Sequence, residues 1–178
     1  MNKLFILEGQ SEGLLAVLQN DNSGKCPFFD AIHTEQLNKD HTFEFSVPAN
    51  HAAAAHVKEN NLVVFKDEDG EYLLFQIYKT EEEHNGLELV TRAYAEHSFF
   101  EMNDDIIEDL RTVNGTASDA MDDALSKSRF KKGIVADLGL RTTNFYYESA
   151  VSSIQKIIQT WGGELKKRVT FDGNKITG

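Results

Sequence analysis

The chain has 178 residues and carries 18 Lys and Arg against 29 Asp and Glu side chains, a formal net charge of −11 at pH 7. Leu, Ile, Val and Phe supply 48 of the 178 residues, above the roughly 20% below which chains tend to stay disordered, so we expect a packed core. No apolar run approaches the roughly 18 residues that cross a bilayer, and the single cysteine, Cys26, excludes an internal disulfide framework.

Residues 1–100 have the pattern of a succession of short strands. Polar and apolar side chains alternate over residues 42–47, which directs Phe43, Phe45 and Val47 toward a core. The turn dipeptides Asp69-Gly70 and Asn85-Gly86 predict two hairpins. The expected strands, about seven in all, lie near residues 4–7, 14–18, 29–36, 42–47, 62–65, 72–78 and 87–95. Many strands at this spacing predict a sandwich or a barrel.

A short helix is expected between two of these strands, at residues 51–59. Ala52 to Ala55 have high helix propensity, and Asn50 can cap the first turn.

The pattern changes after about Phe100. Thr116 or Ser118 can cap a helix that continues through Leu125. A second helix is expected over residues 148–161, and Gly162 supplies its C-terminal stop. Its apolar stripe at helical spacing consists of Val151, Ile154, Ile157, Ile158 and Trp161. Residues 164–177 end the chain with a hairpin around Asp172-Gly173 whose returning strand has barely begun. We therefore expect an α+β chain in which residues 101–178 form a helix-and-hairpin domain, truncated at its C-terminal end.

The negative charge is concentrated in the first part of the chain. Residues 1–100 hold 7 basic and 17 acidic side chains, whereas residues 101–178 hold 11 and 12. Nucleic-acid binding through the phosphate backbone requires a basic surface, so specific DNA or RNA recognition is not expected. Two short basic clusters are interpreted as solvated faces. They are Lys127, Arg129, Lys131 and Lys132, and Lys166, Lys167 and Arg168.

The candidate catalytic and metal-binding residues form no known signature. Cys26 precedes Pro27 in an expected loop without a supporting nucleophile motif. The six histidines are His33, His41, His51, His56, His84 and His97, and the closest pair, His51 and His56, lacks the spacing of four typical of zinc helices. Acidic residues 67–69 and 81–83 lie at expected turns. We therefore predict no catalytic residue, no cofactor site and no metal site in this chain.

Most aromatic side chains are expected in the core. Phe43, Phe45, Phe65, Phe75 and Phe171 lie at strand positions, and Trp161 ends the helical stripe. The tyrosines can either pack or stack on sugars, so a carbohydrate-binding barrel stays open as an alternative. The tyrosines are Tyr72, Tyr78, Tyr94, Tyr146 and Tyr147.

Several segments, in this order, resemble one family of phage proteins. The segments are residues 30–38, 42–49, 61–68 and 94–99, followed by the Trp-Gly-Gly-Glu-Leu sequence of residues 161–165. Together they resemble the N-terminal region of phage tail-associated proteins, the prophage endopeptidase-tail or minor structural proteins of siphophages of low-GC Gram-positive bacteria. The resemblance covers nearly the whole chain.

The resemblance implies a structural role at a phage tail tip. It implies a hub similar to the central hub of contractile-phage baseplates, a homotrimeric ring with an antiparallel β-barrel domain over residues 1–100 and a smaller α/β domain over residues 101–178. The implied partners are the distal tail protein and the tape-measure protein. DNA would pass through the ring, which joins the tail to host-recognition or cell-wall-penetration modules.

The resemblance also bears on enzymatic activity and location. Any lytic activity is expected in downstream modules absent from these residues, so the chain itself is not expected to be an enzyme. The alternative is part of a tail-associated peptidoglycan hydrolase. The N-terminus has no secretory signal, so we expect synthesis in the bacterial cytoplasm and assembly into the virion tail tip.

Overall fold

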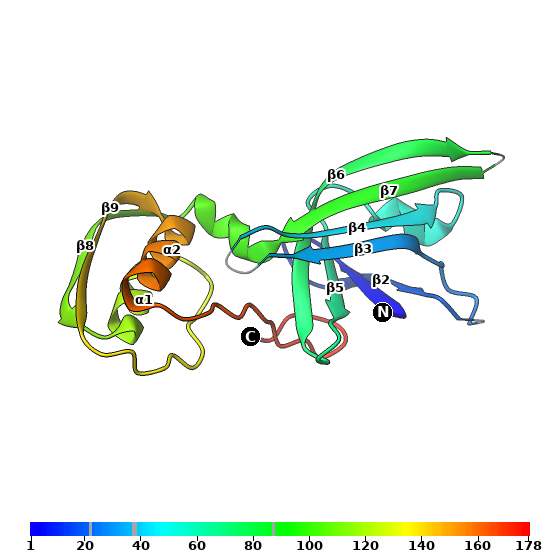
Figure 1. Cartoon of the computed structure of the whole chain (residues 1–178). Coiled ribbons are helices and arrows are strands. Elements are labelled where there is room, and N and C mark those ends of the chain that lie inside the picture. Colours follow the sequence, from blue (N-terminus) through cyan, green and yellow to red (C-terminus); the bar gives the residue numbers. More distant parts are fainter. Residues whose placement is uncertain (22, 37–38, 87) are drawn as a thin grey trace. The chain divides into compact units, whose positions relative to one another are not determined.

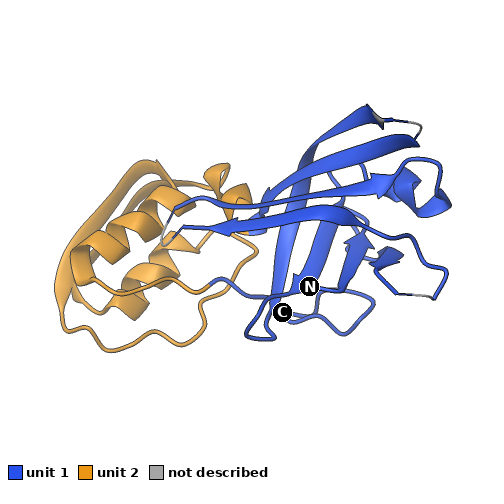
Figure 2. Ribbon diagram, turned by 45° about the vertical axis from the view of Figure 1, so that its right-hand side comes forward, with its two compact units in different colours: residues 1–98, 167–178 blue, residues 99–166 orange. Residues whose placement is uncertain are grey.

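The computed structural model describes residues 1–21, 23–36, 39–86 and 88–178 and divides them into two compact units. Unit 1 contains residues 1–98 together with 167–178, and unit 2 contains residues 99–166 (Figure 2). The chain is mostly antiparallel β-sheet with a few helices, so the expected α+β class is confirmed. Within the described ranges, no helix is long and apolar enough to cross a membrane.

Unit 1 is built on a seven-stranded sheet in the order β2-β1-β5-β6-β7-β4-β3 (Figure 1). The strands are β1 (Lys3–Leu7), β2 (Leu14–Gln19), β3 (Phe29–Glu35), β4 (His41–Pro48), β5 (Leu62–Lys66), β6 (Tyr72–Asn85) and β7 (Glu88–His97). All seven expected strands are present. Strand β6 extends seven residues beyond the expected end at Tyr78, because a register shift between Ile77 and Lys79 lets it continue along β7. Leu87, the first residue of the expected last strand, lies outside the described residues.

The expected closed barrel is not observed. Strands β2 and β3 are the two edges of the sheet, and β2 forms one isolated bridge, between Leu18 and Cys26, with the segment that precedes β3. The segment between these strands contains Pro27, which lacks an N–H group and cannot donate to a continuous ladder. The sheet therefore curves around its core but stays open between β2 and β3.

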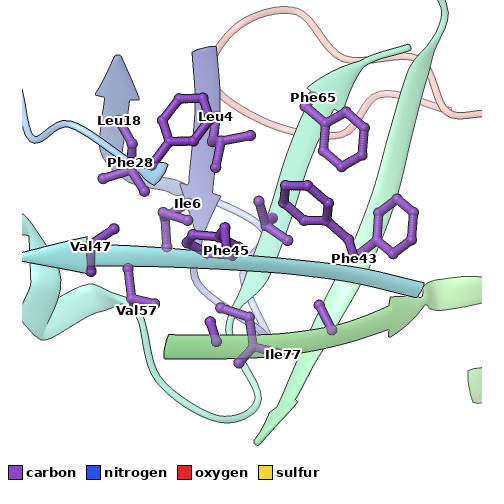
Figure 3. Close-up of a cluster of buried hydrophobic side chains, with 14 of the residues drawn as sticks. Leu4, Ile6, Leu18, Phe28, Phe43, Phe45, Val47, Val57, Phe65 and Ile77 are labelled. Atoms are coloured by element: carbon purple, nitrogen blue, oxygen red, sulfur yellow. The ribbon is translucent and has the colours of Figure 1, made fainter. Parts of the chain in front are cut away.

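One face of the curved sheet covers the main core of unit 1. Phe43, Phe45 and Val47 alternate along β4 and are fully buried, as the sequence predicts. Side chains from β1, β5 and β6 meet them (Figure 3). The cluster includes Leu4, Ile6, Leu18, Phe28, Phe65, Phe75, Ile77 and Val57. Neighbouring phenylalanine rings lie 4.4–5.9 Å apart, the range in which aromatic pairs attract beyond simple burial.

The opposite face of β1, β5 and β6 is also buried. Leu62 and Val64 point to this second face while Val63 and Phe65 point to the first, which explains why this strand is a continuous apolar run. Residues 167–178 cover the second face, where Phe171 contacts Phe5 at a ring distance of 4.9 Å. Val169 bridges to Tyr72, and Phe171 to Ile176 around the predicted Asp172-Gly173 turn.

The short helix in unit 1 is a 3-10 helix, η1 (Ala52–His56). Its N-cap is His51, not the predicted Asn50, because Nδ1 of His51 accepts a hydrogen bond from the backbone N–H of Ala53 at 3.1 Å. An unprotonated ring nitrogen of histidine can therefore accept a hydrogen bond from a backbone N–H of the first helical turn, as the side chains of the smaller capping residues do.

Unit 2 packs two helices on a two-stranded sheet. Strands β8 (Ile106–Gly115) and β9 (Arg141–Ser149) pair antiparallel, and helices α1 (Ala117–Ala124) and α2 (Ala150–Trp161) contact them. A second 3-10 helix, η2, spans Ser98–Asn103. The sequence predicts both α-helices but not the two strands. In β8 only Ile107 and Thr112 are buried, so the strand lacks the regular alternation on which the prediction depends.

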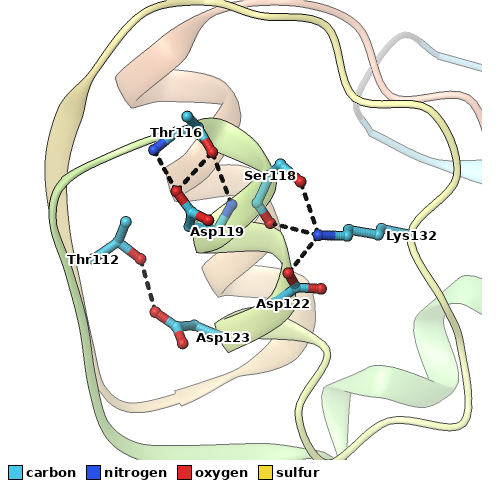
Figure 4. Close-up of polar contacts among 7 residues, drawn as sticks. All are labelled: Thr112, Thr116, Ser118, Asp119, Asp122, Asp123 and Lys132. Atoms are coloured by element: carbon cyan, nitrogen blue, oxygen red, sulfur yellow. Dashed lines mark hydrogen bonds and ion pairs between the residues drawn. The ribbon is translucent and has the colours of Figure 1, made fainter.

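Helix α1 begins with a capping box at Thr116 (Figure 4). Thr116 Oγ1 accepts from the N–H of Asp119, whose carboxylate accepts in return from the N–H of Thr116 at 2.8 Å. The capping residue is therefore Thr116 and not Ser118. Helix α2 begins one residue after its cap, Ser149, and ends at Gly162, whose φ of 85° favours glycine as predicted.

The domain limits predicted from the sequence, 1–100 and 101–178, differ from the compact units in one respect. The closing segment 167–178 belongs to unit 1, since its apolar side chains complete the second core of that unit. The compact units reflect contacts within the chain. The domain limits taken from the sequence stay a prediction.

Phe45→Asp is expected to unfold unit 1, because a charge without a partner in this apolar cluster is strongly disfavoured. The matched control is Ile32→Asp on edge strand β3, where the native side chain is 51% exposed. Chemical denaturation followed by circular dichroism should show a cooperative transition for the control and its loss for Phe45→Asp. An unchanged transition in both variants would contradict the strand assignment.

Ile157→Ala is expected to lower the free energy of unfolding of unit 2 by roughly 2–5 kcal/mol, because Ile157 is buried in the core beneath α2. Ile134→Ala serves as the control, since Ile134 is 96% exposed in the same unit. Urea denaturation of both variants measures the difference. Equal stability of the two would show that the α2 stripe does not form the core.

Candidate functional site

The most concentrated set of titratable side chains in unit 1 lies at one end of its core face. Strand β3 carries His33 and Glu35, β4 carries His41 directly opposite Glu35, and β7 carries His97. The Nε2 atoms of His33 and His41 lie 2.8 Å apart, and the rings of His41 and His97 stack at 4.6 Å. We call His33, Glu35, His41 and His97 the histidine cluster.

The phenylalanine core holds the histidine cluster in place. Phe75 presents its ring to His41 at 4.9 Å and to His97 at 5.2 Å, both nearly perpendicular. His33 makes a similar edge contact with Phe65 at 5.4 Å. These contacts fix the ring orientations, so the cluster is a rigid continuation of the hydrophobic core.

His41 is the most constrained member of the cluster. Its side chain is fully buried, and its Nδ1 has no hydrogen-bond partner within the described residues. Glu35 Oε1 lies 3.6 Å from this nitrogen, beyond hydrogen-bond distance. Burial, with smaller contributions from the charges of Lys167 and His33, lowers the pKa of His41 to about 3. His41 is therefore neutral at physiological pH.

The pKa values of the side chains around His41 are lowered as well. Burial lowers the pKa of His33, and burial together with His41 lowers the pKa of His97 well below its usual range. Burial also lowers the pKa of Lys167, while the charge of Glu35 opposes that shift. The histidine cluster thus combines three imidazoles with one carboxylate, a set that can bind a ligand or a metal ion.

Cys26 is placed where it cannot act as an activated nucleophile. It is buried in the core of unit 1, and this burial raises the pKa of its thiol. Reactive cysteines need the opposite shift, toward the thiolate. Of the other three histidines, His51 caps η1, His56 is its last residue and His84 is exposed on β6, so none joins the cluster.

The acidic turns have structural roles. Asp67 accepts a hydrogen bond from the N–H of Glu71 at 2.8 Å and closes the β5–β6 hairpin. Glu81 pairs with Lys79 at 2.6 Å and accepts from the hydroxyl of Tyr94 at 3.0 Å. Asp67 thus lies at a turn as predicted, whereas Glu81, Glu82 and Glu83 lie within strand β6, paired with β7, and not at the predicted turn.

Three cations of the basic cluster at residues 127–132 form ion pairs within unit 2. Lys127 pairs with Glu108 at 3.0 Å and Arg129 with Glu101 at 2.9 Å. Lys132 contacts Asp122 and donates to Ser118 on α1 (Figure 4). In unit 1, Arg168 lies 3.7 Å from Glu71. These paired cations do not form the open basic surface that phosphate binding needs.

Some aromatic side chains lie in the core and others lie on the surface. Trp161 is buried, and its indole N–H donates to the backbone oxygen of Gly139 at 3.0 Å, which agrees with its predicted core role. Tyr72 packs against Phe171, whereas Tyr78, Tyr146 and Tyr147 are exposed. The last two contact each other edge to face at 4.9 Å on β9.

Sequence reasoning did not find the histidine cluster. His33 and His41 are eight residues apart and His97 lies a further 56 along the chain, so no short motif joins them. The strand register supplies the missing information, because it places His41 opposite Glu35 and diagonal to His33.

Comparison with known families assigns both parts of the chain. Residues 5–97 match the model of the prophage endopeptidase tail N-terminal domain, and residues 104–177 match that of the prophage endopeptidase tail domain. No curated protein matches the chain.

Two solved tail proteins are similar in fold. Prophage tail protein gp18 from Listeria monocytogenes EGD-e is 12% identical with a TM-score of 0.64, and the match covers 99% of this chain and 49% of that protein. The tail protein from Neisseria meningitidis MC58 is 11% identical with a TM-score of 0.52, covering 89% and 45%. The chain therefore spans about half the length of each.

A third protein is less similar. The E. coli c3393 protein, a type VI secretion component described as structurally similar to the T4 tail proteins gp27 and gp5, is 12% identical. That match covers 77% of this chain and 41% of that protein, with a TM-score of 0.48.

The histidine cluster predicts a loss of stability in acid. A histidine with a low pKa in the folded state binds fewer protons than in the unfolded chain, where its pKa is about 6.5. The free energy of unfolding should therefore fall as the pH drops below about 6.5 and continue to fall toward the pKa of His41 at about 3.

Nuclear magnetic resonance of the chain in chelator-treated buffer tests this expectation. The Hε1 resonance of His41 should not shift between pH 8 and pH 5. Titration of His41 near its ordinary pKa would contradict the assignment.

Proposed function

Because this chain belongs to the prophage endopeptidase tail family, we propose that this tail protein forms the N-terminal part of a tail-tip hub. The observation that carries the proposal is the pair of consecutive family matches over residues 5–97 and 104–177. The two similar solved structures are both described as tail proteins, so they support a place in the tail, and the position at the tip is the proposed step.

The proposed hub is a homotrimeric ring. The sheet of unit 1 leaves β2 and β3 as edges, and every residue of β3 after Phe29 is exposed. Strand edges carry unpaired N–H and C=O groups, and pairing with a neighbouring subunit is one way to cover them. The open sheet thus gives a physical reason for assembly through its edges.

The charge of the first part of the chain suits a ring through which DNA passes. Residues 1–100 hold ten more acidic than basic side chains, and a negatively charged wall repels phosphates and avoids trapping the DNA. In this proposal the ring meets the distal tail protein and the tape-measure protein, and it links the tail to host-recognition or cell-wall-penetration modules.

We assign the chain a structural rather than an enzymatic role. The word endopeptidase belongs to the family name, and Cys26, the nucleophile considered from the sequence, is buried with a raised thiol pKa. Peptidoglycan cleavage in the complete protein would therefore come from residues other than this cysteine.

Immunogold electron microscopy tests the proposed position. Antibody raised against residues 1–178 should label the tail tip of purified particles, and averaged images of the tip should show a ring with threefold symmetry. Antibody against the major tube protein serves as the control for labelling along the tail. Label along the tube, or no protein in a blot of purified tails, would contradict the hub assignment.

A further inference from the structure

Part of the histidine cluster has the arrangement of a metal site. His33 and Glu35 are two residues apart on β3 and share one face, and His41 lies opposite Glu35 on β4. One ligand atom from each of these three residues lies within 4.8 Å of the other two. Three potential ligands thus converge from two paired strands at the end of the core.

The metal-free arrangement leaves His41 incompletely bonded. Its Nε2 faces Nε2 of His33 at 2.8 Å, so the two nitrogens share a single proton. Its Nδ1 is buried without a hydrogen-bond partner in the described residues, 3.6 Å from Glu35 Oε1. A buried polar atom without a partner costs free energy and calls for an explanation such as a bound ion.

We propose that His33, His41 and Glu35 bind one divalent transition-metal ion of the Zn²⁺ type, with water completing its coordination. Two imidazole nitrogens and one carboxylate oxygen form a donor set that suits zinc. The ion takes one nitrogen of the buried His41, while the exposed His33 leaves room for water. Glu35 is half exposed, so a side-chain rotation can bring one of its oxygens to the ion.

The surroundings of the site also favour a metal. Phenylalanine rings lie nearly perpendicular to the imidazoles of His33 and His41, at 5.4 and 4.9 Å, and hold both rings in place.

The bound ion would connect edge strand β3 to β4. Side chains on the core face of β3 would hold the ion, whereas the outer backbone groups of the strand stay available for pairing. This inference does not depend on the proposed place at the tail tip.

Isothermal titration calorimetry of the full chain with ZnCl₂ at pH 7.5, after removal of metal with chelator, tests the site. We expect one ion per chain, and no binding of Mg²⁺. His33→Ala should weaken the affinity at least about 100-fold, since even outer partners of metal ligands typically contribute 10–100-fold. Glu35→Gln should weaken it as well.

The control is His84→Ala, which removes an exposed histidine of the same unit and should leave the zinc affinity unchanged. His41 is buried, so its participation is read in the wild-type chain from the shift of its ring ¹⁵N resonances on zinc binding. No zinc binding would overturn the proposal. An affinity that survives His33→Ala, or zinc-induced shifts that leave His41 unaffected, would also overturn it.

Discussion

The fold of unit 1 depends on the burial of three strands on both faces. Strands β1, β5 and β6 direct alternate side chains into two separate cores, so neither face can stay in contact with water. One face is covered by the curvature of the sheet itself. The other is covered by residues 167–178, which return to the first unit after all of unit 2. Because these strands are buried on both faces, the closing segment of the chain lies against the second face.

The same pattern explains which parts of the fold the sequence could predict. Strict alternation at Phe43, Phe45 and Val47 identified β4, and a stripe of helical period identified α2. The strands β8 and β9 were missed because most of their side chains are exposed and follow no simple period. The sequence could not show that the expected barrel stays open, because closure depends on long-range pairing between β2 and β3, about which the local pattern carries no information.

The histidine cluster illustrates a further limit. Metal motifs on helices repeat at fixed short spacings, whereas across a hairpin the spacing depends on the register and the length of the turn. His33 and His41 become neighbours only because Glu35 pairs with His41. The sequence contained every residue of the cluster, but the strand register was needed to bring them together.

The side chains of strand β3 and its backbone edge have separate roles. Its core-face side chains, His33 and Glu35, are held against β4 and the phenylalanine core, while its outer edge has no pairing strand among the described residues. An edge that is already ordered loses less conformational entropy when it pairs with a neighbouring subunit. An ion bound through the side chains would therefore favour ring assembly through the backbone without taking part in the subunit contact.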